Sequence, residues 1–338
     1  MAKESLAVKY RPQTFDDMTE QSAIKDILTN QINTKTFQHG YLFTGPAGTG
    51  KTTSARIFAN MINDGKGNPI EVDAASNSGV DNVRQIIDDA KRKPLDAEYK
   101  IFIVDECHSL SSGSWQALLK TLEEPPKFTI FIFCTTDPQK VPSTILSRVQ
   151  RYNFQKISNE GIEDRLHQII KEELPVGGYV DPVSIAYIAK VSSGGMRSAI
   201  TLLDKCLSLS HDLTLENVLK TIGSEDYSTF ITFLSALTEK EKEISIKVIE
   251  DVYNAGKDVK QFMKDFAKFV LEVEKYALYK NFDYISLPNT LENELEQLID
   301  NSLFDIMDLI VSLNNQIKWE NDAKTLIELS ILIYCGKE

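Results

Sequence analysis

The spacing of apolar and polar residues changes near residue 156. Before it, apolar runs over 41–44, 70–73, 101–104 and 130–134 alternate with segments of helical spacing, and these runs have the length of buried strands. After it, apolar residues recur at helical spacing throughout. Strands that alternate with helices predict a parallel sheet with flanking helices, followed here by wholly helical parts.

The helical part divides further by helix length. Short amphipathic helices are predicted over 162–174, 182–192, 196–207 and 215–222, with glycine pairs at 177–178 and 194–195. Longer helices are predicted over 244–254, 259–280, 291–319, with a break near Ser302, and 322–334. With a boundary at Gly223-Ser224, we expect three domains: an α/β domain at 1–155, a small helical lid at 156–222 and an all-α domain at 223–338.

Composition narrows the class of protein. The chain has 338 residues, 42% hydrophobic and 25% charged, as in globular proteins, and no run of 18 apolar residues that would predict a membrane span. Residues 1–5 lack the apolar core of a signal peptide, so we expect a cytoplasmic protein. The four cysteines stand far apart without a C-x-x-C pair, which favours buried free thiols over a zinc site or disulfides.

The net charge of −12 is not spread evenly along the chain. Residues 1–155 hold 18 Lys and Arg against 18 Asp and Glu, residues 156–222 hold 7 against 9, and residues 223–338 hold 12 against 22. The acidity, which would oppose binding of nucleic acid, therefore lies mainly in the last third. A local basic face on the N-terminal domain stays compatible with this distribution.

One segment fits a known motif at every fixed position. Residues 45–52 read G-P-A-G-T-G-K-T, the phosphate-binding pattern G-x-x-x-x-G-K-[ST], between a predicted strand and a predicted helix. The glycines let backbone N–H groups curl around phosphate oxygens, and the following helix directs its positive end at them. We expect Lys51 to reach the β and γ phosphates of a nucleotide and Thr52 to bind Mg²⁺.

Two carboxylates follow the predicted strand at 101–104. Ligands bind at the carboxyl ends of the strands in doubly wound sheets, so Asp105 is predicted to hold Mg²⁺. Glu106 is predicted to polarise the water that attacks the γ phosphate. The strand at 130–134 leads into Thr135 and Thr136, whose hydroxyls could touch a water or phosphate, although spacing alone favours this role only weakly.

Several further segments accompany these motifs: 9–15 (K-Y-R-P-Q-T-F), 73–81 (D-A-A-S-N-S-G-V-D), 118–126, 135–140 (T-T-D-P-Q-K), 147–148 (S-R) and 194–197 (G-G-M-R). Together with the phosphate loop and Asp105-Glu106, they resemble the clamp-loader ATPases of the AAA+ class, in particular the gamma/tau subunits of bacterial DNA polymerase III. The resemblance covers nearly the whole chain, and the combination is far more specific than the phosphate loop alone.

The resemblance implies a subunit of a pentameric ring that uses ATP and Mg²⁺ to open a ring-shaped sliding clamp and place it on primer-template DNA. It also implies that the segment Tyr10-Arg11-Pro12 lies near the adenine. The expected nucleotide-binding residues are then Tyr10, Arg11, Pro12, Gly45, Pro46, Ala47, Gly48, Thr49, Gly50, Lys51, Thr52, Thr53 and Arg197.

The same resemblance implies roles for polar residues outside the phosphate loop. Thr136, or its neighbour Thr135, resembles the first sensor, and Arg197 the second sensor on the γ phosphate of the same subunit. Arg148 resembles the arginine finger that enters a neighbouring subunit's site. Hydrolysis would then depend on assembly, because the charge of the transition state is fully stabilised only where two subunits meet.

Contacts with DNA are expected on the helix predicted over 81–93 and on the loop before it. The resemblance implies that the N-terminal end of this helix follows the DNA backbone and that its C-terminal end approaches the clamp. Ser76, Asn77 and Arg84 suit contacts with phosphates, which position DNA without reading its bases. The long helices of 223–338 resemble the collar that holds the ring together.

Two features depart from the family pattern. Bacterial members carry a four-cysteine zinc module before the strand that ends at Asp73, whereas residues 64–69 here form a short connection without cysteine, so no zinc is expected. The chain also stops after the helical collar, without the tau extension that contacts helicase and polymerase. This short form favours a divergent source such as a phage, whose protein would work in the host cytoplasm.

Two alternative functions share these motifs. One is a DNA-remodelling ATPase of the branch-migration type, which acts without a clamp. The other is a nucleotide-binding scaffold subunit of a replication complex that does not hydrolyse ATP. Loss of Lys51 or Glu106 would favour the scaffold, and both residues are present.

Overall fold

The computed structural model describes residues 4–174, 177–222, 227–285, 287–288, 291–299, 303–320 and 322–336. The chain divides into two compact units, one of residues Met1–Leu174 and Ile188–Asp204, the other of residues Pro175–Tyr187 and Lys205–Glu338. The division passes through helices α8 (Pro182–Val191) and α9 (Met196–Leu209). The three domains expected from the sequence stay a prediction, and their boundary at Gly223-Ser224 lies outside the described residues.

The first unit contains a parallel sheet of five strands in the order β2-β3-β4-β1-β5. The strands are β1 (Gly40–Thr44), β2 (Ile70–Asp73), β3 (Lys100–Asp105), β4 (Thr129–Thr135) and β5 (Gln150–Asn153). Four of them confirm the apolar runs of the sequence. The fifth, β5, was missed because it is a polar edge strand in which only Tyr152 is buried.

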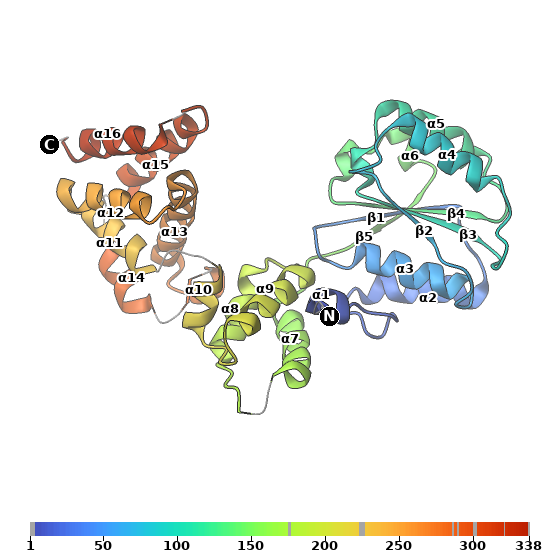
Figure 1. Cartoon of the computed structure of the whole chain (residues 1–338), viewed down its shortest axis with the longest axis horizontal. Coiled ribbons are helices and arrows are strands. Elements are labelled where there is room, and N and C mark those ends of the chain that lie inside the picture. The colour runs from blue at the N-terminus through green and yellow to red at the C-terminus, as the bar shows by residue number, and fades with distance from the viewer. Residues whose placement is uncertain are drawn as a thin grey trace. The chain divides into compact units, whose positions relative to one another are not determined.

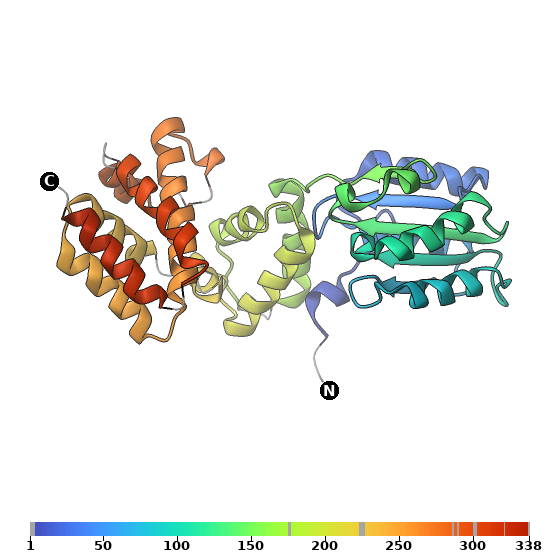
Figure 2. The same ribbon diagram turned by 90° about the horizontal axis from the view of Figure 1, so that it is seen from above.

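Helices cover both faces of this sheet (Figure 1). One face carries α2 (Ser22–Thr34) and α3 (Lys51–Ile62), and the other carries α4 (Val80–Ala90), α5 (Ser112–Glu123) and the short α6 (Ser143–Leu146). Each face has its own apolar cluster, around Phe43 and Phe58 on one side and around Phe102 and Trp115 on the other. Figure 2 shows the strands running side by side. The predicted α/β fold is confirmed.

The connections of this unit are short. They include α1 (Leu6–Lys9) and the 3-10 turns η1 (Cys107–Ser109) and η2 (Pro138–Lys140). Helix α7 (Asn159–Glu173) begins earlier than the predicted 162 because the Ser158 side chain accepts the N–H of Gly161 and caps it. Helix α4 ends at Ala90, so the basic residues 91–93 follow the helix rather than form its last turn as predicted.

The second unit is helical in its described part. Its remaining elements are α10 (Leu215–Ile222), α11 (Tyr227–Thr238), α12 (Lys242–Asn254), α13 (Val259–Tyr279), η3 (Phe282–Tyr284), α14 (Glu292–Leu298), α15 (Leu303–Ile317) and α16 (Ala323–Cys335). The helix predicted over 291–319 is two helices, α14 and α15, and Ser302 itself lies outside the described residues. The chain has no described helix long and apolar enough for a membrane span.

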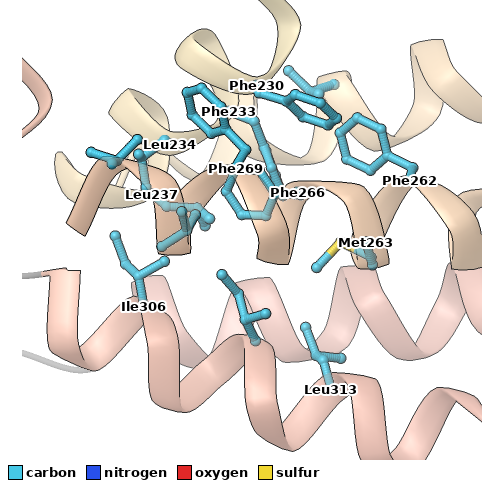
Figure 3. Packing of buried hydrophobic residues seen from close by; sticks show 14 of the residues in the cluster. Phe230, Phe233, Leu234, Leu237, Phe262, Met263, Phe266, Phe269, Ile306 and Leu313 are labelled. Atoms are coloured by element: carbon cyan, nitrogen blue, oxygen red, sulfur yellow. The ribbon is translucent and has the colours of Figure 1, made fainter. Parts of the chain in front are cut away.

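The core of the second unit is built on aromatic rings. Figure 3 shows Phe230 and Phe233 of α11 facing the rings of α13. The ring centroids of Phe233 and Phe266 lie 4.7 Å apart, and those of Phe230 and Phe262 lie 5.3 Å apart. Helix α11 was missed in the sequence although its Ser and Thr residues recur at helical spacing, because it has no charged residue and its polar face is only weakly marked.

Candidate nucleotide-binding site

The carboxyl ends of the central strands bring the sequence motifs together. In the register of the sheet, Thr44 at the end of β1 lies opposite Thr135 at the end of β4, and Asp105 at the end of β3 lies opposite Asp73. The segments that follow β1, β3 and β4 therefore leave the same edge of the sheet, called the carboxyl edge below. These segments are the phosphate loop, Asp105-Glu106 and Thr135-Thr136.

The phosphate loop has the backbone that its glycines permit. Gly45 and Gly48 have φ of 144° and 75°, in the region that favours glycine. A Cβ atom on Gly45 would lie 2.3 Å from the carbonyl oxygen of Phe154, so a side chain there has no room. The Thr49 hydroxyl donates a hydrogen bond of 2.9 Å to the carbonyl of Pro46 across the loop. The loop conformation therefore depends on its glycines and on the hydrogen bond between Thr49 and Pro46.

Lys51, the first residue of α3, lies inside this loop with 6% of its surface exposed. Its Nζ donates to the carbonyl oxygens of Gly45 at 2.9 Å and Pro46 at 2.8 Å. Burial lowers the pKa of the Lys51 ammonium from its usual value. A buried cation that is satisfied by only two carbonyls favours further anionic partners, such as phosphate oxygens.

Thr52 and Asp105 meet at the end of β3. The Thr52 hydroxyl donates to Asp105 Oδ2 at 2.8 Å, and the N–H of Glu106 donates to Asp105 Oδ1 at 3.0 Å. A hydroxyl and a carboxylate are the hard oxygen ligands that Mg²⁺ prefers, and Mg²⁺ usually takes its remaining ligands from water and substrate phosphates. The pair expected to hold Mg²⁺ therefore has suitable chemistry and lies in one place.

The Glu106 carboxylate contacts two side chains, those of Thr136 and His108. Its backbone is left-handed, with φ of 45°, and its Oε2 accepts a hydrogen bond of 3.1 Å from the Thr136 hydroxyl. His108 Nδ1 lies 3.2 Å from the same oxygen and 3.0 Å from Thr135 Oγ1. Thr136 thus reaches Glu106 directly and Thr135 reaches it through His108. The sequence reasoning missed His108, and the only signal for it was its place two residues after Glu106.

A cavity of about 490 Å³ opens beside these groups, entirely within the first unit. Its lining includes five cationic side chains, of Arg11, Lys51, Arg56, Arg165 and Arg197, and three carboxylates, of Asp17, Asp105 and Glu106. All expected nucleotide-binding residues line it except Gly45 and Pro46, which form the start of the phosphate loop. The excess of cationic groups favours a polyphosphate ligand.

The segment Tyr10-Arg11-Pro12 lines the same cavity. The Tyr10 hydroxyl donates to Glu173 Oε1 of α7 at 2.7 Å, and burial together with this carboxylate raises the pKa of Tyr10. Burial lowers the pKa of Arg11, and the nearby guanidinium groups of Arg56 and Arg197 lower it further. The three arginines therefore repel one another, and an anion between them would relieve that repulsion.

The start of α9 packs directly on the phosphate loop. A Cβ atom on Gly48 would lie 3.1 Å from Gly195 Cα, and one on Gly195 would lie 3.1 Å from the Ala47 carbonyl oxygen. Two glycines in contact let the two backbones approach this closely. The contact brings Arg197, in the first turn of α9, to the cavity.

Arg148 lies at the opposite edge of the sheet, called the amino edge below. It precedes β5, and its backbone lies beside Gly40, the first residue of β1. Its Nη2 lies 2.5 Å from Glu123 Oε1 at the end of α5. Arg148 is not part of the cavity lining, so the structure does not bring it into the site of its own chain.

The residues expected to contact DNA lie in the loop after β2 and on α4. The Ser76 hydroxyl donates to Asp73 Oδ2 at 2.7 Å, and the Asn77 side chain donates to the Asp73 carbonyl at 3.1 Å. Arg84 pairs with Asp81 at 3.1 Å, and both side chains are exposed. Ser76 and Arg84 thus already pair with carboxylates and Asn77 with a backbone carbonyl, and the contact of these residues with DNA stays a prediction.

Known proteins resemble this chain across its length. A family model described as "DNA polymerase III, delta subunit" matches residues 70–158. The DNA polymerase III subunit tau of Bacillus subtilis is 34% identical over 99% of this chain and 64% of its own length. The subunit tau of Escherichia coli is 32% identical over 76% of this chain and 43% of its own length. The chain thus spans between 43% and 64% of the length of these two relatives.

Among solved structures, the RuvB Holliday junction branch migration motor of Thermotoga maritima has a similar fold. It superposes with a TM-score of 0.52 at 19% identity, over 68% of this chain and 80% of that chain. At this identity the likeness concerns the fold alone. Over the part of those longer proteins that it matches, the chain is a homologue of the tau and gamma/tau subunits of bacterial DNA polymerase III.

Proposed function

We propose that this chain is the ATP-hydrolysing motor subunit of a DNA sliding-clamp loader, which opens the clamp, places it on primer-template DNA and releases it. One observation supports the ATPase activity most directly: the carboxyl edge brings Lys51, the Thr52–Asp105 pair and Glu106 to one cationic cavity. The similarity to DNA polymerase III tau and gamma/tau subunits supports the clamp-loader role.

Each group at the carboxyl edge has a proposed part in binding. Backbone N–H groups of residues 45–52 and Lys51 hold the phosphates, while Tyr10, Arg11 and Pro12 line the region proposed for the adenine. Thr52 and Asp105 would hold Mg²⁺, which neutralises charge on phosphate oxygens when bound. We propose no zinc site, which elemental analysis of the purified protein would test.

Hydrolysis needs a base and a sensor. Glu106 is proposed to polarise the attacking water, and Thr136 to contact the γ phosphate. The Thr136 hydroxyl has a single hydrogen, which it gives to Glu106 in this structure. Thr136 can therefore donate to a phosphate only if it gives up its hydrogen bond to Glu106. Nucleotide binding would in this way change the orientation of the Glu106 carboxylate. Arg197 is proposed as the second contact to the γ phosphate.

Arg148 is proposed to act in the site of a neighbouring subunit. Its place at the amino edge supports this role, since the cavity of its own chain lies at the carboxyl edge. A pentameric ring held by residues 223–338 would present it to the neighbour. Removal of these residues should leave a monomer, and a ring that persists without them would contradict this assignment.

The surface of α4 and its flanking loops is proposed to meet DNA and clamp. Ser76, Asn77 and Arg84 would contact the DNA backbone. Past the end of α4, Lys91, Arg92 and Lys93 are exposed, and Leu95 is 98% exposed. An apolar side chain this exposed, next to a basic group, suits a protein contact, so we propose this end for the clamp.

The test is ATP hydrolysis by the full chain assembled with its companion subunits. Clamp and primed DNA should stimulate phosphate release. Lys51→Ala should lower it about 10² to 10³-fold, while Lys66→Ala, which changes an exposed lysine on the connection after α3, should leave it unchanged. Equal phosphate release by Lys51→Ala would contradict the ATPase. Stimulation by junction DNA without a clamp would instead support a branch-migration motor, and absence of release in every assembly would support a scaffold.

A further inference from the structure

The turn after Glu106 places His108 beside the Glu106 carboxylate, the proposed catalytic base. In η1, His108 Nδ1 lies 3.2 Å from Glu106 Oε2 and 3.0 Å from Thr135 Oγ1, and 19% of its side chain is exposed. Thr135 is fully buried at the end of β4, where its hydroxyl oxygen also accepts the N–H of Asp137 at 3.0 Å. The imidazole therefore connects a rigid position of the sheet with a more exposed carboxylate.

The carboxylate determines which nitrogen of His108 carries hydrogen. An ionised carboxylate only accepts hydrogen bonds, so the contact with Glu106 is favourable when Nδ1 carries the hydrogen. In that tautomer Nδ1 donates to Thr135 Oγ1 at 3.0 Å, and Glu106 Oε2 lies beside it, 3.2 Å from the same nitrogen. His108 thus contacts the same oxygen of Glu106 that accepts the hydrogen bond from Thr136.

The two donors differ in what else they can reach. Thr136 is proposed to give its single hydrogen to the nucleotide, and Glu106 then loses that bond. His108 is not among the residues lining the cavity, so nucleotide and histidine do not compete for contact. Glu106 needs such support because 39% of its side chain is exposed and its backbone is in a left-handed conformation that non-glycine residues seldom adopt.

We propose that His108 is a positioning residue for ATP hydrolysis: it holds the Glu106 carboxylate against the end of β4 while Thr136 turns to the nucleotide. This inference rests on the proposed ATPase. A base that is misplaced by about 1 Å loses roughly 100-fold in rate, so a residue that fixes its position affects kcat rather than binding.

The test compares variants of the full chain in its assembled complex. His108→Ala should lower kcat about 10- to 100-fold and leave the KM for ATP and the affinity for a non-hydrolysable ATP analogue nearly unchanged. His108→Asn places an amide donor near the position of Nδ1 and should recover most of the activity. His211→Ala, which removes an exposed histidine of the second unit, is the matched control and should behave as the wild type.

A second comparison tests whether His108 acts through Glu106. In single-turnover hydrolysis, His108→Ala should cause no further loss when Glu106 is already Gln. A further loss in that background, wild-type kcat in His108→Ala, or no recovery in His108→Asn would overturn the inference. If instead Lys51→Ala and Glu106→Gln both leave hydrolysis unchanged, the proposed ATPase itself is wrong.

Discussion

The two edges of the sheet differ in whether their proposed functional residues contact one another within the chain. At the carboxyl edge, residues from three strand ends already contact one another, and Lys51, Thr52, Asp105 and Glu106 each have a partner within the site. At the amino edge, Arg148 stands apart from that site and pairs with Glu123. The carboxyl edge therefore has the groups that nucleotide binding requires. The amino edge carries Arg148, which is proposed to act in the nucleotide site of a neighbouring chain.

The largest effect is expected at the amino edge. Arg148→Ala should lower kcat in the assembled complex by about 10³-fold or more, because an arginine finger stabilises charge that develops in the transition state. The isolated chain, in which no neighbour is present, should hydrolyse ATP as slowly as before. Steady-state phosphate release by both forms measures this difference, and an equal loss in the isolated chain would place Arg148 in its own site.

Lys51→Ala, at the carboxyl edge, should impair both the assembled complex and the isolated chain. Loss of a buried cationic donor is expected to lower kcat by about 10² to 10³-fold and to weaken nucleotide binding. Fluorescent-nucleotide titration of the isolated chain, with Arg148→Ala as the control that keeps its affinity, separates the two edges. Unchanged affinity in Lys51→Ala would show that the loop is not the phosphate site.

Thr136→Val should have a smaller effect at the carboxyl edge. A neutral hydroxyl donor is weaker than a charged one, so we expect kcat to fall about 10- to 100-fold. Thr144→Val, an exposed residue of α6 whose backbone carbonyl alone contacts Arg148, should change little. Both rates come from the same phosphate-release assay, and a wild-type rate for Thr136→Val would shift the sensor role to Thr135.

Glu123→Gln should have the smallest effect. The ion pair with Arg148 is partly exposed, with 32% and 49% of the two side chains accessible, and such pairs contribute about 0–1 kcal/mol. Weakening it should free Arg148 for a neighbour and raise the rate of the complex by up to about fivefold, which corresponds to that energy. A lower rate would mean that Glu123 holds Arg148 in its working orientation.

The parts that could be predicted from sequence are those with a local physical signature. The phosphate loop needs glycines at fixed places, and buried strands such as β3 need unbroken apolar runs, so both are visible in the sequence. Strand β5 is polar and shows no apolar run, and the polar face of helix α11 holds only Ser and Thr, without a charged residue to mark it. His108 could not be predicted because its role depends on Thr135, 27 residues away in the chain.

The contact between Gly48 and Gly195 has a mechanical consequence. Where two side chains meet, a change of rotamer can absorb a small displacement, but two backbones in contact have no such freedom. A shift of the phosphate loop on binding its ligand should therefore pass undiminished into the first turn of α9. The displacement should then be carried along this helix as far as Asp204, its last residue in the first unit.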